Sequence, residues 1–284
     1  MYFKIKKYIL FVVCSIGILF FNSINTFASK EGYIASFNIL RLGESKKDFV
    51  QTAKLLQGFD IVGLVEVINR DGLEELVDEL NKQGNDKWDY HISPFSVGST
   101  RYKEYFAYVY KKNKVKFLQS EGFYKNGKSS FLREPYGATF KIGNFDFTFI
   151  LVHTIYGDSE SKRKAENFKM VDVYDYFQDK DRKENDILIA GDFNLYALDE
   201  SFQPMYKHKD KITYAIDPAI KTTIGQNGRA NSYDNFFLST KYTQEFTGSS
   251  GALDFSEKNP KLMRKIISDH IPVFIVVDIL KDDD

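Results

Sequence analysis

Several side chains capable of acid, base or metal chemistry stand at the ends of apolar segments of the chain. They are Asn38, Glu66, His153, Asp192 with Asn194, Asp234, and Asp269 with His270. Each one alone has an ordinary explanation, such as a helix cap, a turn or a surface loop. The placement recurs, however, and includes two of the four histidines. Because loops at strand ends are where a rigid sheet presents reactive groups, the pattern indicates one site.

These residue types suit the hydrolysis of a phosphodiester. That reaction needs neutralised phosphoryl oxygens, an activated water and a protonated leaving oxygen. Hard oxygen ligands such as Glu66, Asp192 and Asp269 suit Mg²⁺, and histidines paired with carboxylates suit the acid and base roles. The sequence has no cluster with zinc-ligand spacing and no phosphate-binding loop of the nucleoside triphosphate type. We therefore expect a metal-dependent phosphodiesterase, with Asn194 helping to stabilise the charged phosphorus centre.

Patterns of apolar residues predict the elements that hold these groups. Strands are expected at 32–38, 60–66, 105–110, 115–122, 136–142, 145–152, 187–190, 234–238 and 272–278. Helices are expected after Ser45 as an N-cap, over 71–83 and between 159 and 178. Several neighbouring strands have no helix between them. This order favours two packed sheets flanked by helices over a purely doubly wound sheet.

Length and charge restrict the class of protein. The 284 residues suffice for one large α/β domain, and the chain shows no separate signals for a second one. Lys plus Arg and Asp plus Glu both number 39. This balance argues against a protein that binds nucleic acid through a broad basic surface, but it is compatible with an enzyme that holds a few phosphates.

The N-terminal residues are typical of a secretory signal peptide. Lys4, Lys6 and Lys7 precede an apolar run over 8–21, and small residues follow up to Ala28. The alternative, a membrane anchor, needs about 20 apolar residues, and this run is shorter. We therefore expect cleavage near Ala28, with 1–28 as the signal peptide and 29–284 as a single catalytic domain that is secreted or periplasmic. The only cysteine, Cys14, lies in the leader, so the mature protein has no disulfide and no cysteine nucleophile.

Five motifs, in order along the chain, resemble those of the endonuclease/exonuclease/phosphatase superfamily. They are Ser36–Ile39 (SFNI), Glu66, Leu151–His153 (LVH), Gly191–Asn194 (GDFN) and Ser268–Val273 (SDHIPV). Arg101–Glu104, Phe131–Pro135 and Ser232–Asp234 are further similar to segments of deoxyribonuclease I-like secreted nucleases. The resemblance spans nearly all of the mature chain. It implies an α/β fold, a four-layer αββα sandwich in which two mixed, mainly antiparallel sheets are flanked by helices.

The resemblance also implies a role for each site residue. The catalytic group would comprise an acid/base pair of histidines, the carboxylates that support them, and two residues that contact the metal and the scissile phosphate: His153, His270, Glu104, Asp234, Asp192 and Asn194. The metal group would be Glu66, with Asp269 and Asn38 close to it. The residues that contact nucleic acid would be Arg133, Tyr102 and Arg41. The cofactor would be Mg²⁺, with Mn²⁺ as a substitute.

Three departures from the deoxyribonuclease I-like pattern limit these implications. Leu40 stands where those enzymes have an arginine, and Arg41 follows one place later. Ile68 replaces a second arginine, with Arg70 nearby. Because such arginines reach the minor groove, the cutting pattern is not implied. The segment 217–232 also aligns poorly with the loop that binds structural Ca²⁺, so a calcium requirement is not implied either.

The main expectation is a monomeric endonuclease that cuts duplex DNA and leaves 5′-phosphate ends, with no membrane insertion of the mature chain. One alternative is a lipid phosphodiesterase of the sphingomyelinase kind. In that case Phe123-Tyr124 and Phe236-Phe237 would be candidates for membrane-inserting hairpins. A second alternative is the catalytic subunit of a secreted toxin.

Overall fold

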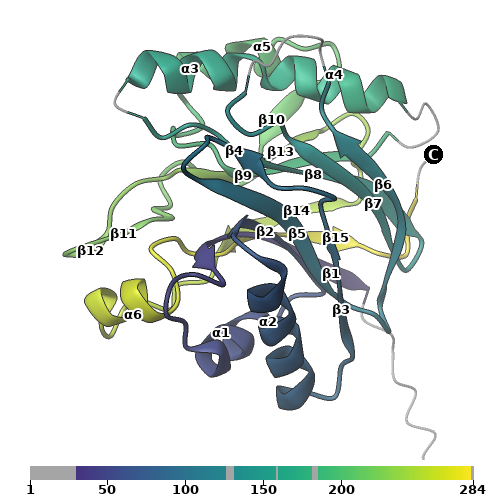
Figure 1. Cartoon of the computed structure of the whole chain (residues 1–284). Coiled ribbons are helices and arrows are strands. Elements are labelled where there is room, and N and C mark those ends of the chain that lie inside the picture. Colours follow the sequence, from purple (N-terminus) through teal and green to yellow (C-terminus); the bar gives the residue numbers. More distant parts are fainter. Residues whose placement is uncertain (1–29, 126–130, 158, 181–184, 283–284) are drawn as a thin grey trace, which may run out of the picture.

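The computed structural model describes residues 30–125, 131–157, 159–180 and 185–282. The predicted signal peptide, residues 1–28, lies outside these residues. Figure 1 shows four layers, in which two stacked sheets lie between an upper and a lower layer of helices. None of the helices described is long and apolar enough to cross a membrane.

The first sheet contains the earliest and the latest strands of the chain. In spatial order its strands are β14 (Phe246–Ala252), β15 (Val273–Asp278), β1 (Glu31–Leu42), β2 (Ile61–Val67), β5 (Lys103–Lys111) and β3 (Trp88–Ile92), and β4 (Val97–Gly98) also pairs with β5. Strands β1 and β2 are parallel and are connected through helix α1 (Phe49–Leu56), whereas the other pairs are antiparallel. The carboxyl ends of β1 and β2 therefore lie at the same edge.

The second sheet has a similar plan. In spatial order its strands are β10 (Ile212–Tyr214), β13 (Asp234–Ser239), β9 (Ile187–Asp192), β8 (Phe145–His153), β7 (Tyr136–Ile142) and β6 (Val115–Phe123). Its parallel pair is β8 and β9, connected through α3 (Glu160–Phe168) and α4 (Met170–Lys180). A small hairpin of β11 (Ile224–Gly225) and β12 (Gly228–Arg229) stands apart from both sheets. Each sheet thus supplies one edge at which two strands end side by side.

Aromatic side chains fill much of the space between the sheets. Tyr108 of β5 and Phe149 of β8 are fully buried there, and the Tyr108 hydroxyl donates to the Phe149 carbonyl at 2.8 Å. The sheets approach closely at Gly63, where an added Cβ would lie 2.4 Å from Cδ2 of Leu151. Phenylalanine and tyrosine side chains from both sheets thus form a continuous part of this interior.

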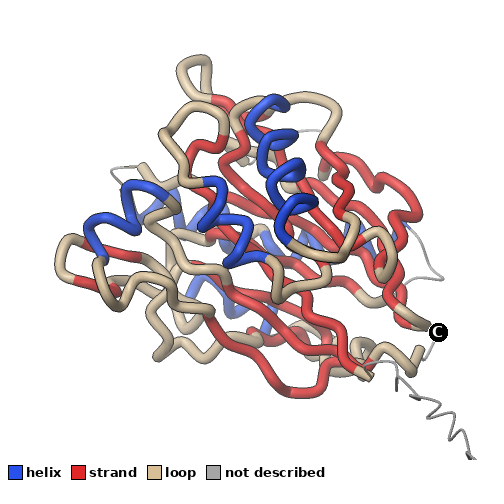
Figure 2. The backbone as a smooth tube through the Cα atoms, turned by 90° about the horizontal axis from the view of Figure 1, so that it is seen from below, coloured by secondary structure: helices blue, strands red, loops and turns tan. Residues whose placement is uncertain are grey.

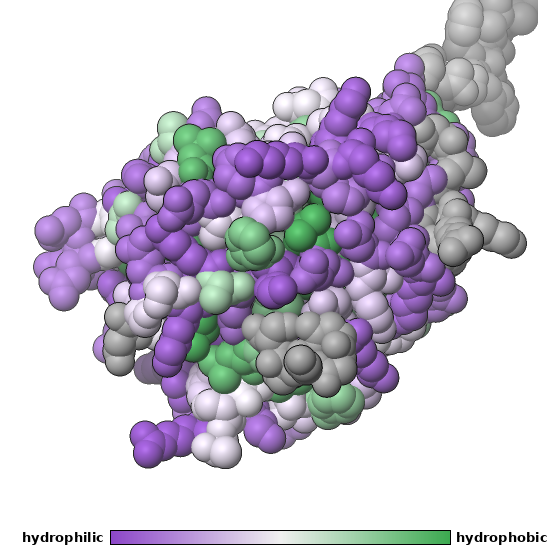
Figure 3. All heavy atoms as spheres, turned by 90° about the horizontal axis from the view of Figure 1, so that it is seen from above, coloured by the Kyte–Doolittle hydropathy of each residue, from purple (hydrophilic) through white to green (hydrophobic). Residues whose placement is uncertain are grey.

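Helices cover the outer face of each sheet with apolar side chains. Leu56 of α1 and Leu76 of α2 (Arg70–Gln83) pack with Val62 against the first sheet, and Figure 2 shows these helices from below. Val173 and Phe177 of α4 belong to the cluster that covers the second sheet. Figure 3, seen from above, shows a mostly hydrophilic outer surface with a few apolar side chains. The remaining helical segments are η1 (Glu200–Phe202), α5 (Gln203–Tyr206) and α6 (Pro260–Ile266).

The sandwich predicted from the sequence is confirmed, but two details of the helices differ. Ser45 is not an N-cap, because its hydroxyl donates to the Leu40 carbonyl in the preceding turn, and Asp48 caps α1 instead. The single helix expected between 159 and 178 is two helices, which meet at Lys169. In both cases local hydrogen bonds that the apolar pattern does not reveal set the boundary.

Candidate active site

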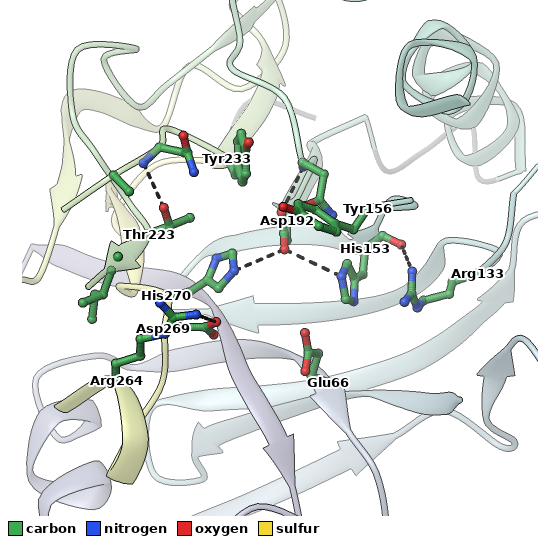
Figure 4. A pocket seen from close by; sticks show the side chains of 15 residues that line it. Glu66, Arg133, His153, Tyr156, Asp192, Thr223, Tyr233, Arg264, Asp269 and His270 are labelled. Carbon is green, nitrogen blue, oxygen red and sulfur yellow. Dashed lines mark hydrogen bonds and ion pairs between the residues drawn. The ribbon is translucent and has the colours of Figure 1, made fainter. Parts of the chain in front are cut away.

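Side chains at the ends of the two parallel strand pairs meet in one groove at an edge of the sandwich (Figure 4). Strands β1 and β2 of the first sheet and β8 and β9 of the second end there. The groove has a volume of about 420 Å³, and its lining includes Glu66, His153, Asp192, Asp269 and His270. The structure therefore brings together the polar groups that the sequence places far apart.

Two of the residues that line the groove have backbone in the left-handed region, with φ of 63° at Glu66 and 50° at Asn194. A register shift in the pairing of β2 with β5 surrounds Glu66. Such conformations cost about 1–3 kcal/mol in a non-glycine residue and persist where neighbouring contacts hold them. Here the Arg41 amide donates to Glu66 Oε2 at 3.1 Å, and the Asn194 amide donates to Asp192 Oδ1 at 2.9 Å. Both turns therefore aim a polar side chain at the groove and hold it there.

His153, at the end of β8, is held by a buried carboxylate of the opposite sheet. Its Nδ1 lies 2.8 Å from Oε1 of Glu104, at the start of β5. The other oxygen of Glu104 lies 3.1 Å from Nε of Arg133. Burial lowers the pKa of His153, but the charge and hydrogen bond of Glu104, together with the charge of Asp192, raise it overall. Glu104 thus orients the ring through Nδ1, and Nε2 is left to face the groove.

His270 has the same arrangement with the sheets exchanged. It precedes β15 of the first sheet, and its Nδ1 lies 2.8 Å from Oδ2 of Asp234, which begins β13 of the second. The Thr222 hydroxyl donates to the same Asp234 oxygen at 2.7 Å. Burial lowers the pKa of His270, but the charges of Asp234 and Asp192 raise it to about 10. The site therefore contains two histidines, each supported from behind by a carboxylate.

Asp192 lies between the two histidines. Its Oδ2 is 3.6 Å from Nε2 of His153 and 3.5 Å from Nε2 of His270, and Figure 4 shows both rings turned toward it. The preceding residue, Gly191, pairs so closely with β8 that an added Cβ would lie 1.9 Å from the Val152 carbonyl oxygen. Two nitrogens that can accept or donate a proton therefore flank one point of the groove.

The carboxylates of Glu66 and Asp269 also reach the groove. The side-chain NH₂ of Asn38 donates to Glu66 Oε1 at 3.0 Å and to Asp192 Oδ2 at 3.1 Å, whereas its oxygen accepts from the Leu40 amide. Asn38 is thus close to Glu66, but it links two carboxylates through its NH₂ group. Several hard oxygen donors that converge on one groove fit an ion such as Mg²⁺.

A second grouping of ligand atoms overlaps this one. Among the residues that the structure describes, one group of histidine and acidic side chains can hold a metal ion: Asp192, Asp234 and His270, whose ligand atoms lie within 4.8 Å of one another. Asp234 is buried, and its carboxylate already accepts from Thr222 and contacts His270. Asp192 is therefore the member of this group that remains best placed to reach an ion in the groove.

The three residues that the resemblance assigned to nucleic-acid contact lie next to one another. The guanidinium carbons of Arg41 and Arg133 are 5.1 and 5.6 Å from the centroid of the Tyr102 ring, in the range of a cation–π interaction. Arg133 lines the groove but is only 8% exposed, and its Nη1 donates to the His153 carbonyl at 3.2 Å. Arg133 therefore also holds the end of β8, and its contact with nucleic acid stays a prediction.

Two residues of α3 that the sequence analysis did not single out hold the loops of the site. The buried carboxylate of Glu166 accepts from the Leu132 and Ile155 amides, each at 2.6 Å. The neighbouring Asn167 donates to the Phe193 carbonyl at 2.9 Å. Leu132 directly precedes Arg133, Ile155 follows His153 by two residues, and Phe193 lies within the GDFN motif. In the sequence, Glu166 and Asn167 look like ordinary polar residues of an exposed helix.

Other residues at the groove also escaped the sequence analysis. Tyr156, Tyr233 and Arg264 line it, and Arg264 lies 3.6 Å from Asp269. Lys47 is half-buried nearby, and burial lowers its pKa to about 8, although the charges of Glu66 and Asp269 act in the opposite direction. Tyr233 lies within the Ser232–Asp234 segment, but that segment does not show that the tyrosine side chain reaches the groove. The other three residues belong to no motif, so only the fold could place them.

Comparison with known proteins gives a consistent family match. The family described as "Endonuclease/Exonuclease/phosphatase family" matches residues 35–270. A protein named Deoxyribonuclease from Thioalkalivibrio sp. is 27% identical over 263 residues, which cover 86% of this chain and 70% of that protein. Deoxyribonuclease-1 of Bos taurus is 27% identical over 269 residues, which cover 86% of this chain and 91% of the bovine protein.

Solved structures share the fold. An endonuclease/exonuclease/phosphatase family protein from Bacteroides thetaiotaomicron superimposes with a TM-score of 0.60 at 18% identity, and the match covers 87% of this chain and 97% of that one. TDP2 of D. rerio, complexed with a single strand DNA product, gives a TM-score of 0.59 at 17% identity over 87% and 99% of the two chains. At this identity the likeness concerns the architecture alone.

Proposed function

The chain belongs to the endonuclease/exonuclease/phosphatase family, and from this premise we propose that it is a metal-dependent DNA endonuclease. The relatives named deoxyribonuclease match 80% or more of the chain, which supports DNA as the substrate. The observation that supports the chemistry most directly is the pair of histidines. Each is oriented through Nδ1 by a carboxylate, and each turns Nε2 toward Asp192.

In the proposed reaction, water attacks the scissile phosphorus and the bond from phosphorus to the 3′ oxygen breaks. One histidine takes a proton from the water at Nε2, and the other donates a proton from Nε2 to the departing 3′ oxygen. The products are a 3′-hydroxyl and a 5′-phosphate. Glu104 and Asp234 would act as positioning residues, because their carboxylates fix the ring orientation and stabilise the protonated imidazole. Asn194 would contact the phosphate from the left-handed turn that follows β9.

Glu66, Asp192 and Asp269 would hold the divalent ion, because their oxygens reach one groove and suit the preference of Mg²⁺ for hard ligands. When bound, the ion would neutralise charge on the phosphoryl oxygens. Asn38 would keep Glu66 and Asp192 at a fixed spacing through its two donated hydrogen bonds. We expect Mn²⁺ to substitute, because it also accepts oxygen ligands.

The alternative of a lipid phosphodiesterase loses its supporting feature. Phe123, Tyr124, Phe236 and Phe237 are all at least nine-tenths buried in the core clusters. None of them forms an exposed hairpin that could insert into a membrane. These segments therefore give no support to a lipid substrate.

Nicking of supercoiled plasmid by residues 29–284, with and without EDTA, tests the proposal. We expect Mg²⁺-dependent nicking that His153→Ala lowers about 10²-fold or more. His208→Ala is the matched control, because His208 contacts Asp175 and Asp210 and does not line the groove. A folded wild-type protein that leaves plasmid and linear duplex uncut would refute the proposal, and equal activity of His153→Ala and His208→Ala would refute the role of His153.

A further inference from the structure

Two tyrosines of the groove have no part in the proposed chemistry. Tyr156 follows His153 by three residues, and Tyr233 directly precedes Asp234. Figure 4 shows both on the same side of the histidines as Asp192, away from Glu66. The Tyr156 side chain is 65% exposed although it stands at the rim of a catalytic groove. An aromatic ring left in water at this position is available to a bound molecule.

Arg163 of α3 connects the two tyrosines. Its guanidinium carbon lies 5.6 Å from the centroid of the Tyr156 ring. It also lies close enough to the Tyr233 hydroxyl to oppose the rise in pKa that burial causes there. The three side chains therefore form one group at the rim, which we call the tyrosine rim: Tyr156, Arg163 and Tyr233.

The surroundings of the tyrosine rim restrict the chemical class of its ligand. A quaternary ammonium group, as in phosphocholine, would meet the positive charge of Arg163 beside the ring that it would have to occupy. An acyl chain would need a continuous apolar wall, but the groove continues into Asp192, Asn194 and Asn231. A nucleobase has a neutral flat face that stacks on aromatic rings and a polar edge that suits such a lining.

We propose that the tyrosine rim is a nucleobase subsite, in which Tyr156 stacks on a base adjacent to the scissile phosphate. This inference rests on the proposed nuclease function and adds a second point of recognition to it. In a paired duplex both faces of a base are already stacked. An unpaired or locally frayed nucleotide is therefore the form of DNA that the subsite accepts most readily.

The test is cleavage of single-stranded oligonucleotides in which every linkage but one is a phosphorothioate. The nucleotides on either side of that linkage are normal in one substrate and abasic in the other. We expect Tyr156→Ala to lower kcat/KM on the normal substrate by about 5-fold to 150-fold, as the loss of one stacked base would, and by much less on the abasic one. Tyr156→Phe, which keeps the ring, should retain most of the wild-type kcat/KM on the normal substrate.

Phe168→Ala provides the control, since Phe168 is an exposed aromatic residue at the end of α3 that does not line the groove. Equal losses for Tyr156→Ala on the normal and the abasic substrate would overturn the subsite while leaving the nuclease function intact. An equal loss in Phe168→Ala would overturn it as well. If the wild-type protein cuts neither oligonucleotide nor plasmid but releases phosphocholine from sphingomyelin vesicles, the proposed function fails, and the subsite with it.

Discussion

Replacement of Glu166 by alanine tests whether α3 positions the catalytic loops. The Glu166 carboxylate accepts from the amides of Leu132 and Ile155, each at 2.6 Å, and its side chain is buried. Leu132 adjoins Arg133, and Ile155 is two residues from His153. One carboxylate thus joins the segment before β7 to the segment after β8, which lie at the same edge of the second sheet because the two strands are antiparallel. Without that carboxylate, both amides lose their acceptor and must bind water or remain without a hydrogen bond.

The expected loss of stability follows from the two hydrogen bonds. A hydrogen bond to a charged group contributes about 1.5–3 kcal/mol, and the amides are only partly buried, so about 2–4 kcal/mol is expected for both together. For a chain of this size that corresponds to a fall in Tm of roughly 5–15 °C. Displacement of His153 by about 1 Å can cost on the order of 10²-fold in rate even where the fold persists.

The assay combines thermal unfolding with single-turnover cleavage at a temperature where circular dichroism shows the variant to be folded. Glu160→Ala is the matched control, because Glu160 lies in the first turn of the same helix and its side chain is exposed. We expect Glu166→Ala to lose both stability and cleavage rate and Glu160→Ala to lose neither. If folded Glu166→Ala cleaves at the wild-type rate, Glu166 does not position the site.

Two further substitutions test the support of His270 and the packing of the sheets. Because its pKa is raised to about 10, His270 stabilises the metal-free fold fully below its unfolded pKa of about 6.5, and this contribution is lost as the pH rises toward 10. The free energy of unfolding is measured with urea at pH 6.5 and at pH 9.5, in EDTA. Between these pH values it should fall by on the order of 2 kcal/mol less in Asp234→Asn than in the wild type. An equal fall in the two proteins would contradict the coupling of His270 to Asp234. Gly63→Ala would place a Cβ 2.4 Å from Leu151 and should cost about 1–3 kcal/mol in thermal unfolding. Gly58→Ala, whose Cβ would have nothing within 4 Å, should leave the Tm nearly unchanged, and equal values for the two variants would refute the steric argument.

The sequence predicted the histidines and acidic residues that line the groove better than the residues that support them. His153 and Asp192 stand at the ends of apolar strands, so local pattern placed them at one edge of a sheet. The carboxylates that contact the histidine rings could not be predicted in the same way. Glu104 was identified only through the resemblance, whereas Asp234 also stands at the end of an apolar segment. Nothing in the local pattern of either residue shows which histidine ring its carboxylate faces.

Residues that hold the site from outside could not be predicted. Thr222 donates to Asp234 from a loop without regular structure, and Glu166 lies on a polar helix whose every turn has similar residues. Tyr156 is one of 18 tyrosines, and nothing in its sequence context distinguishes it from the others. Such roles depend on which surfaces meet when the sheets dock. Periodicity along a single chain does not contain that information.

Each histidine pair takes one member from each sheet: His153 of the second pairs with Glu104 of the first, and His270 of the first pairs with Asp234 of the second. Asn38 and Asp192 are joined across the same boundary. A chain in which only one sheet has formed therefore has no complete histidine–carboxylate pair, and we expect it to be inactive. During refolding, cleavage activity should then return in one step as the two sheets dock. The rate at which activity returns would therefore report the rate of docking.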